Sequence, residues 1–132
     1  MSTLNVANIQ SLTTNTLPIV KNSAGTEVGQ FARAWALING TGTASITANF
    51  NVSSIADNGT GEYTFTFATA LSNANYSAVA SGCLNASGDT SITSIFPFDF
   101  TTTTIKIDTF RLQSNAAVPR DFEILSFAIF GD

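Results

Sequence analysis

The sequence predicts an all-β fold, an antiparallel β-sandwich of jelly-roll-like type with an extended N-terminal arm. Asn-Gly-Thr-Gly occurs twice, at 39–42 and 58–61, each time between runs of alternating apolar and polar residues. Asn-Gly tolerates the positive φ values of a type I′ turn, so each copy predicts a tight hairpin. The polar residues are mainly Thr, Ser and Asn, and β-branched Thr favours strands over helices. Roughly seven or eight strands at regular spacing indicate a sandwich.

A change in composition divides the 132 residues into two segments. Every Phe, Tyr and Trp lies at or after Phe31. Residues 31–132 are therefore predicted to form the sandwich domain. Residues 1–30 hold scattered aliphatic residues without a helix or strand period, interrupted by Pro18 and a turn at 22–25. Such a segment cannot bury enough apolar area alone, so we expect an anchoring arm that orders against another chain. Its anchoring residues are predicted to be Leu4, Val6, Ile9, Leu12, Leu17 and Ile19.

The expected strands of the sandwich follow one another from residue 33. They are 33–39, 44–52, 62–67, 76–82, 91–96, 103–112 and 122–130. Segment 33–39 is apolar on both faces and predicts a central strand. Segment 44–52 alternates, which predicts that Ile46, Ala48, Phe50 and Val52 point inward.

The last two expected strands carry less regular patterns. In 103–112, Ile105 and Ile107 lie on one face and Phe110 on the other, which predicts a bulge or a crossing between sheets near Asp108. Segment 122–130 is apolar on both faces and is expected in the middle of a sheet or against a neighbouring subunit.

Charge restricts the partners of this chain. Charged residues make up 11% of the sequence, against roughly 25% in soluble domains, so we expect chains to associate. The net charge is −4 and the five cations are dispersed, which argues against nucleic acid and anionic membranes as partners. No apolar run approaches the ~18 residues of a membrane span. Residues 1–6 lack the pattern of a secretory signal, so we expect assembly in a cytoplasm.

The side chains that most enzymes need are absent. The chain has no His and a single Cys, Cys83, which we expect to act as a small buried apolar residue. We therefore predict no catalytic site, no metal and no cofactor. A glycan-degrading enzyme remains as a third class, working through Asp99 or through the pair Asp57 and Glu62. Asp99 is expected in a surface loop instead.

A ligand site, if present, is expected on polar hairpin tips that project from a rigid sheet. The aromatic residues Trp35, Tyr63 and Tyr76 are expected in the core and not on a sugar-binding platform. The candidate binding residues in the loops are Asp57, Asn58, Thr60, Asn73, Asn75, Asn85 and Asp89.

Several segments resemble a known family. Residues 2–12 and 18–29 resemble small structural proteins of tailed bacteriophages, especially those that infect cyanobacteria. Arg33–Trp35, the two Asn-Gly-Thr-Gly segments and residues 50–65 look like the β-domain of tail-fibre-type phage proteins. The resemblance covers about residues 1–82 and implies a homotrimeric component of the virion. It implies that the N-terminal segment docks on the particle and that the β-domain faces outward. It brings no binding site with it.

These observations lead to one function and one alternative. We expect a phage virion structural protein, a trimeric tail fibre or receptor-binding protein that attaches the particle to a host surface glycan. The alternative is a capsid decoration (cement) protein that stabilises the head shell. In both, other virion proteins bind through the arm.

Overall fold

The computed structural model describes residue 18, residues 20–85 and residues 92–131. The chain divides into two units, Met1–Phe31 and Ala32–Asp132. In the first unit, β1 (Val20–Lys21) and β2 (Glu27–Gly29) form an antiparallel hairpin. Its turn lies at the predicted position, because Asn22 Oδ1 accepts hydrogen bonds from the backbone N–H groups of Ala24 and Thr26. The six side chains that we expect to anchor the arm lie outside the described residues.

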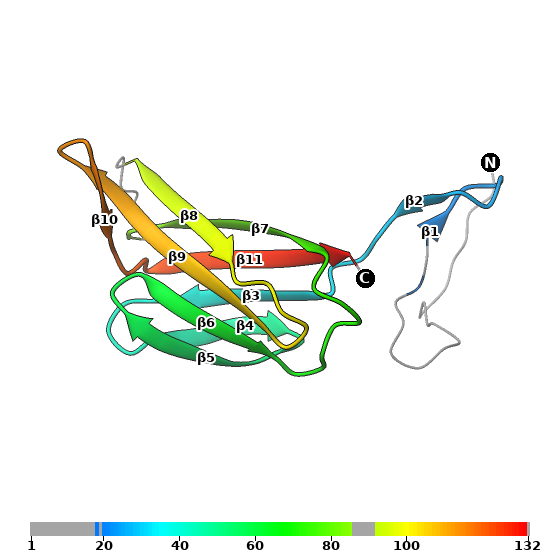
Figure 1. Ribbon diagram of the computed structural model, residues 1–132, viewed down its shortest axis with the longest axis horizontal. Helices are drawn as coiled ribbons and strands as arrows, with labels where there is room; N and C mark the ends of the chain where they lie inside the picture. Colours follow the sequence, from blue (N-terminus) through cyan, green and yellow to red (C-terminus); the bar gives the residue numbers. More distant parts are fainter. Residues whose placement is uncertain (1–17, 19, 86–91, 132) are drawn as a thin grey trace. The chain divides into compact units, whose positions relative to one another are not determined.

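The second unit is built from two antiparallel sheets (Figure 1). Sheet I has the order β4-β3-β11-β7 and consists of β3 (Ala34–Asn39), β4 (Ser45–Phe50), β7 (Tyr76–Cys83) and β11 (Ile124–Gly131). Sheet II has the order β5-β6-β9-β8, with β10 beside the far end of β9. Its strands are β5 (Val52–Gly59), β6 (Glu62–Phe67), β8 (Thr93–Phe98), β9 (Thr104–Gln113) and β10 (Ala116–Pro119).

The described part of the chain contains no helix, which confirms the all-β antiparallel class. It accordingly holds no helix of the length and apolar character that crossing a membrane requires.

The two sheets share one hydrophobic core, so their arrangement is sandwich-like. Sheet I contributes Phe127 and sheet II contributes Phe65, and the centroids of the two rings lie 4.8 Å apart. Both side chains are almost completely buried, and burying a Phe side chain contributes about 1.5–3 kcal/mol. The predicted core positions of Tyr63 and Tyr76 are confirmed, since both side chains are buried.

Both predicted hairpins form, but the predicted turn type is wrong. Neither Asn39 nor Asn58 has a positive φ. In the first loop, Asn39 Oδ1 instead accepts from the backbone N–H of Thr41 at 2.9 Å, an Asx turn. In the second, Gly61 takes the positive φ, at 74°. A Cβ at Gly61 would lie 2.5 Å from a backbone oxygen, so only glycine fits this position.

The predicted single strand 44–52 is wrong because Asn51 passes the chain from sheet I to sheet II. Asn51 has φ 56°, and its side chain bonds the backbone of Arg33 and Thr69. A register shift within β4 also reverses the expected direction of two side chains. Ala48 and Phe50 pair with Leu37 and Trp35 on the outer face of sheet I, and not with the core. Phe50 is accordingly 48% exposed.

Two further expectations are corrected in β9 and β3. The ladders of β9 with β6 and β8 contain no register shift, so no bulge lies near Asp108. Phe110 instead lies on the outer face of a regular strand that changes partner from β6 to β10. Trp35 is 39% exposed and does not belong to the core. The central positions predicted for 33–39 and 122–130 are confirmed, since β3 and β11 occupy the middle of sheet I.

Candidate functional site

The candidate binding residues do not form one cluster. The turn between β5 and β6 holds Asp57, Asn58 and Thr60 at one end of the sandwich. Asn85 lies at the same end, where the backbone N–H of Glu123 bonds the carbonyl of Leu84.

Asn73 and Asn75 lie at the opposite end, in the loop before β7. This loop is tied to the β8–β9 loop by the bond from Leu71 N to Thr102 O. Asp89 lies outside the described residues. Loops at the two ends cannot bind one small ligand together.

Several of these polar side chains shape their own loops. Asp57 Oδ1 accepts from the backbone N–H of Gly59 at 3.1 Å, and Asn73 Oδ1 accepts from that of Asn75 at 2.7 Å. Both bonds are local turn interactions. Asp57 pairs across the hairpin with Tyr63, so it lies on the opposite face from Glu62. The two carboxylates considered as a catalytic pair therefore point to different sides of the sheet.

Asn58 belongs to a groove that runs over the outer face of sheet II. The irregular pairing between Asp57 and Gly59 places Asn58 on this face, where its Nδ2 donates to Thr64 Oγ1 at 2.8 Å. The groove has a volume of about 360 Å³. Its outward-facing residues are Asn58, Glu62, Thr64, Phe98, Lys106 and Asp108. Register explains this grouping, since Glu62 pairs with Asp108, and Lys106 pairs with Thr64 on one side and Phe98 on the other.

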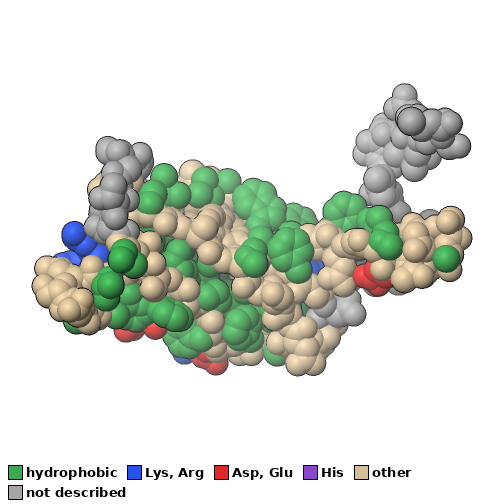
Figure 2. All heavy atoms as spheres, turned by 90° about the horizontal axis from the view of Figure 1, so that it is seen from above, with side chains coloured by type: hydrophobic (Ala, Val, Ile, Leu, Met, Phe, Trp, Pro, Cys, Tyr) green, Lys and Arg blue, Asp and Glu red, His purple; other side chains and the backbone are tan. Residues whose placement is uncertain are grey.

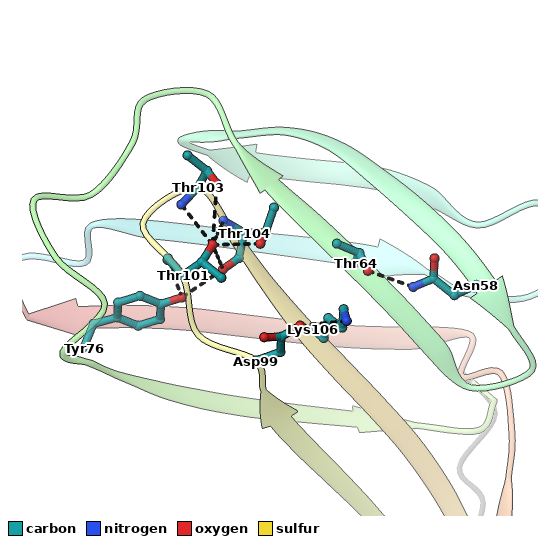
Figure 3. Close-up of polar contacts among 8 residues, drawn as sticks. All are labelled: Asn58, Thr64, Tyr76, Asp99, Thr101, Thr103, Thr104 and Lys106. Carbon is teal, nitrogen blue, oxygen red and sulfur yellow. Dashed lines mark hydrogen bonds and ion pairs between the residues drawn. The ribbon is translucent and has the colours of Figure 1, made fainter.

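An ion pair fixes the lysine of the groove (Figure 3). Lys106 Nζ lies 2.7 Å from Asp99 Oδ2 and 6.0 Å from the centroid of the Phe98 ring. The hydrogen bond and charge of Asp99 raise the pKa of Lys106, so the ammonium stays charged. Asp99 has φ 50° and lies in the exposed loop that the sequence predicts.

This loop is closed tightly. Thr101 Oγ1 accepts from the backbone N–H of Thr104 at 2.8 Å, and the Tyr76 hydroxyl lies 3.1 Å from the Thr101 carbonyl oxygen.

The acidic side of the groove consists of Glu62 and Asp108, which face each other across two strands. Partial burial raises the pKa of Asp108, the charge of Glu62 raises it further, and Lys106 acts in the opposite direction. The two carboxylates offer hydrogen-bond acceptors beside the donors of Lys106 and Asn58. Among the described residues, no group of three or more His, Cys, Asp and Glu side chains is placed to hold a metal ion.

Sequence reasoning identified Asn58 but missed the other groove residues. Glu62 and Thr64 were recognised as outward-facing, and Lys106 and Asp108 alternate with buried isoleucines in the same way. Only the pairing of β6 with β9 brings the four side chains together, and these strands are separated by β7 and β8 in the chain.

Comparison of the chain with protein-family models, curated proteins and solved structures gives no match.

Proposed function

We propose that this chain is a phage virion structural protein, a trimeric tail fibre or receptor-binding protein that attaches the particle to a host surface glycan. The observation that supports this proposal is the groove over sheet II. It combines a 39%-exposed phenyl ring, Phe98, with fixed donors and acceptors on regular strands. Sugar rings present apolar C–H faces and many hydroxyl groups, and this combination of groups matches both.

The groove is organised before a ligand arrives. Asp99 holds Lys106, and Thr64 holds Asn58, so two donors already have defined positions. A ligand that binds here loses less entropy in ordering the side chains. The groove is open and shallow, so a single site binds weakly. Several copies on one particle convert weak single-site binding into firm attachment.

The virion location is tested by immunogold electron microscopy of purified particles, with an antibody against residues 32–132. Gold at the tail or baseplate supports the adhesin. Gold nowhere on the particle contradicts a virion protein.

The glycan is tested by binding of the full chain to surface polysaccharide extracted from the host bacterium. We expect Asn58→Ala and Phe98→Ala to weaken binding at least about tenfold, which corresponds to about 1.4 kcal/mol. Phe96→Ala is the matched control, because Phe96 is exposed on the same strand and does not line the groove. Equal binding by all three variants would contradict a site in this groove.

The alternative is a capsid decoration protein. It is favoured by the apolar outer face of sheet I, which fits attachment to a protein shell as well as association between copies of this chain. Gold over the head, together with loss of shell stability when the protein is removed, supports this alternative.

The jelly-roll-like topology and the anchoring arm belong to the same proposal. In support of the former, strands far apart in sequence are neighbours in both sheets, β3 with β11 and β6 with β9. For the arm, deletion of residues 1–30 is expected to abolish incorporation into particles and to leave the sandwich folded. A deleted chain that still enters particles contradicts the anchoring role.

A further inference from the structure

The outer face of sheet I is a continuous apolar surface. The registers place Phe50, Trp35, Ala128 and Val79 in one row across all four strands. Ala48, Leu37, Ser126 and Ser81 form the next row. The exposed fraction of the large side chains is high, up to 56% at Val79. Figure 2 shows hydrophobic side chains gathered in several places on the visible surface, with few charged atoms among them.

Sheet I carries no charge at all. Its four strands, of six, six, eight and eight residues, contain no Asp, Glu, Lys or Arg. Sheet II differs, since its strands carry charged residues on β5, β6 and β9. Charged side chains, especially Lys, are the usual protection of edge strands against other chains. The edge strands of sheet I, β4 and β7, have none.

The relief of this face is a ridge beside a groove. Phe50, Trp35 and Leu37 stand out from β4 and β3 as the ridge. Next to them, the small side chains of Ser126 and Ala128 on β11 form the floor of a groove of about 340 Å³. Val79 on β7 forms its opposite wall.

Ridge and groove fit each other in size and polarity, and both are uncharged. One copy of this face therefore meets another without like-charge repulsion and without desolvating a charge.

The area is sufficient to begin an interface. A sheet of four strands with six to eight residues each measures roughly 19 by 22 Å at the usual spacing and rise, or about 400 Å². Apolar patches of this size on a single chain mark interaction sites. A standard interface buries about 800 Å² from each partner. The planar value is a lower bound, because side chains stand out from the plane, and residues beside the face supply the remainder.

We infer that the outer face of sheet I binds a second copy of this chain, with the ridge of Phe50, Trp35 and Leu37 of one copy in the Ser126–Ala128 groove of the next. Ridge and groove are separate patches, so the contact is heterologous and closes into a ring. This inference rests on the homotrimer of the proposed function and assigns its interface.

The test is the mass of the full chain in solution, measured by sedimentation velocity over a range of concentrations. We expect three times 13.8 kDa for the natural sequence. Phe50→Lys and Val79→Lys are expected to reduce the mass threefold, because each places a charge in the interface. Phe96→Lys is the matched control. It changes the same residue type at similar exposure, on an edge strand of sheet II, and is expected to leave the trimer intact.

Each other outcome identifies which statement fails. A trimer that survives both Phe50→Lys and Val79→Lys overturns the assigned interface and leaves the trimer standing. A dimer that Phe50→Lys dissociates supports the interface and contradicts the trimer. A monomeric natural chain at every concentration overturns the inference, while particle labelling and glycan binding still test the proposed function separately. Circular dichroism of each variant shows that a lower mass does not result from unfolding.

Discussion

The hydroxyl group of Tyr63 is expected to contribute more to stability than any other single polar atom in the core. Tyr63 is completely buried, and its hydroxyl donates to Asp121 Oδ1 at 2.9 Å, with the carbonyl oxygen of Gly40 at 3.2 Å. Asp121 Oδ1 also accepts from the backbone N–H of Gly61 at 2.7 Å. The hydroxyl therefore links the β3–β4 loop, the β5–β6 turn and the segment before β11.

Tyr63→Phe removes this hydrogen bond without changing the ring. A bond to a charged acceptor contributes about 1.5–3 kcal/mol, so we expect a loss of about 2 kcal/mol in the free energy of unfolding. At roughly 4 °C per kcal/mol, Tm falls by about 8 °C. Tyr76→Phe is the matched control, because the Tyr76 hydroxyl bonds only neutral carbonyl oxygens. Its loss is expected to be about 1 kcal/mol.

The assay is urea unfolding followed by circular dichroism at one fixed protein concentration, since association shifts apparent stability. Asp121→Ala in the natural and Tyr63→Phe backgrounds completes a double-mutant cycle. We expect a coupling energy of about 1 kcal/mol or more. A Tyr63→Phe loss below about 0.5 kcal/mol, or no larger than that of Tyr76→Phe, would refute the reasoning.

Three further results are expected. Burial, and then the hydrogen bond to Asp121, raise the pKa of Tyr63, so the folded chain keeps a proton that the unfolded chain loses above about pH 10. The free energy of unfolding should therefore fall as pH rises above about 10, and Tyr63→Phe should make that fall shallower in urea titrations. Gly61→Ala should cost about 3 kcal/mol or more in thermal unfolding, against about 1 kcal/mol for Gly42→Ala, where φ is also positive but a methyl group meets no atom within 4 Å. Glu62→Gln should lower the pKa of Asp108 in an NMR titration; no change would contradict their proximity.

Local patterns in the sequence predicted strands well where one face is buried. In β6, Tyr63, Phe65 and Phe67 alternate with polar residues, and the structure has the strand at the predicted bounds. The hairpins at the two Asn-Gly-Thr-Gly segments also form. Their turn geometry differs because side-chain bonds of Asn39 and Asp57 to nearby backbone N–H groups compete with the type I′ turn.

The failures have one physical origin, contacts between residues far apart in the chain. Asn51 interrupts a regular alternation because Arg33 and Thr69 hold its side chain where the chain changes sheets. The groove over sheet II depends on the pairing of β6 with β9, which no local period encodes. Trp35 was assigned to the core by its residue type, but neighbouring Ala34 and Ala36 fill the inner positions of that strand.

The central place of β11 in sheet I has a consequence for how the chain folds. β11 is the last described strand, yet it separates β3 from β7 and pairs with both. During synthesis, β3 and β7 therefore wait with unpaired edges until residues 124–131 have been made. Such long-range pairing slows folding into the range of milliseconds to seconds and leaves uncharged strand edges open to other nascent chains. Conditions that slow translation near the C-terminus should therefore increase aggregation of this protein, and refolding of the complete chain should avoid it.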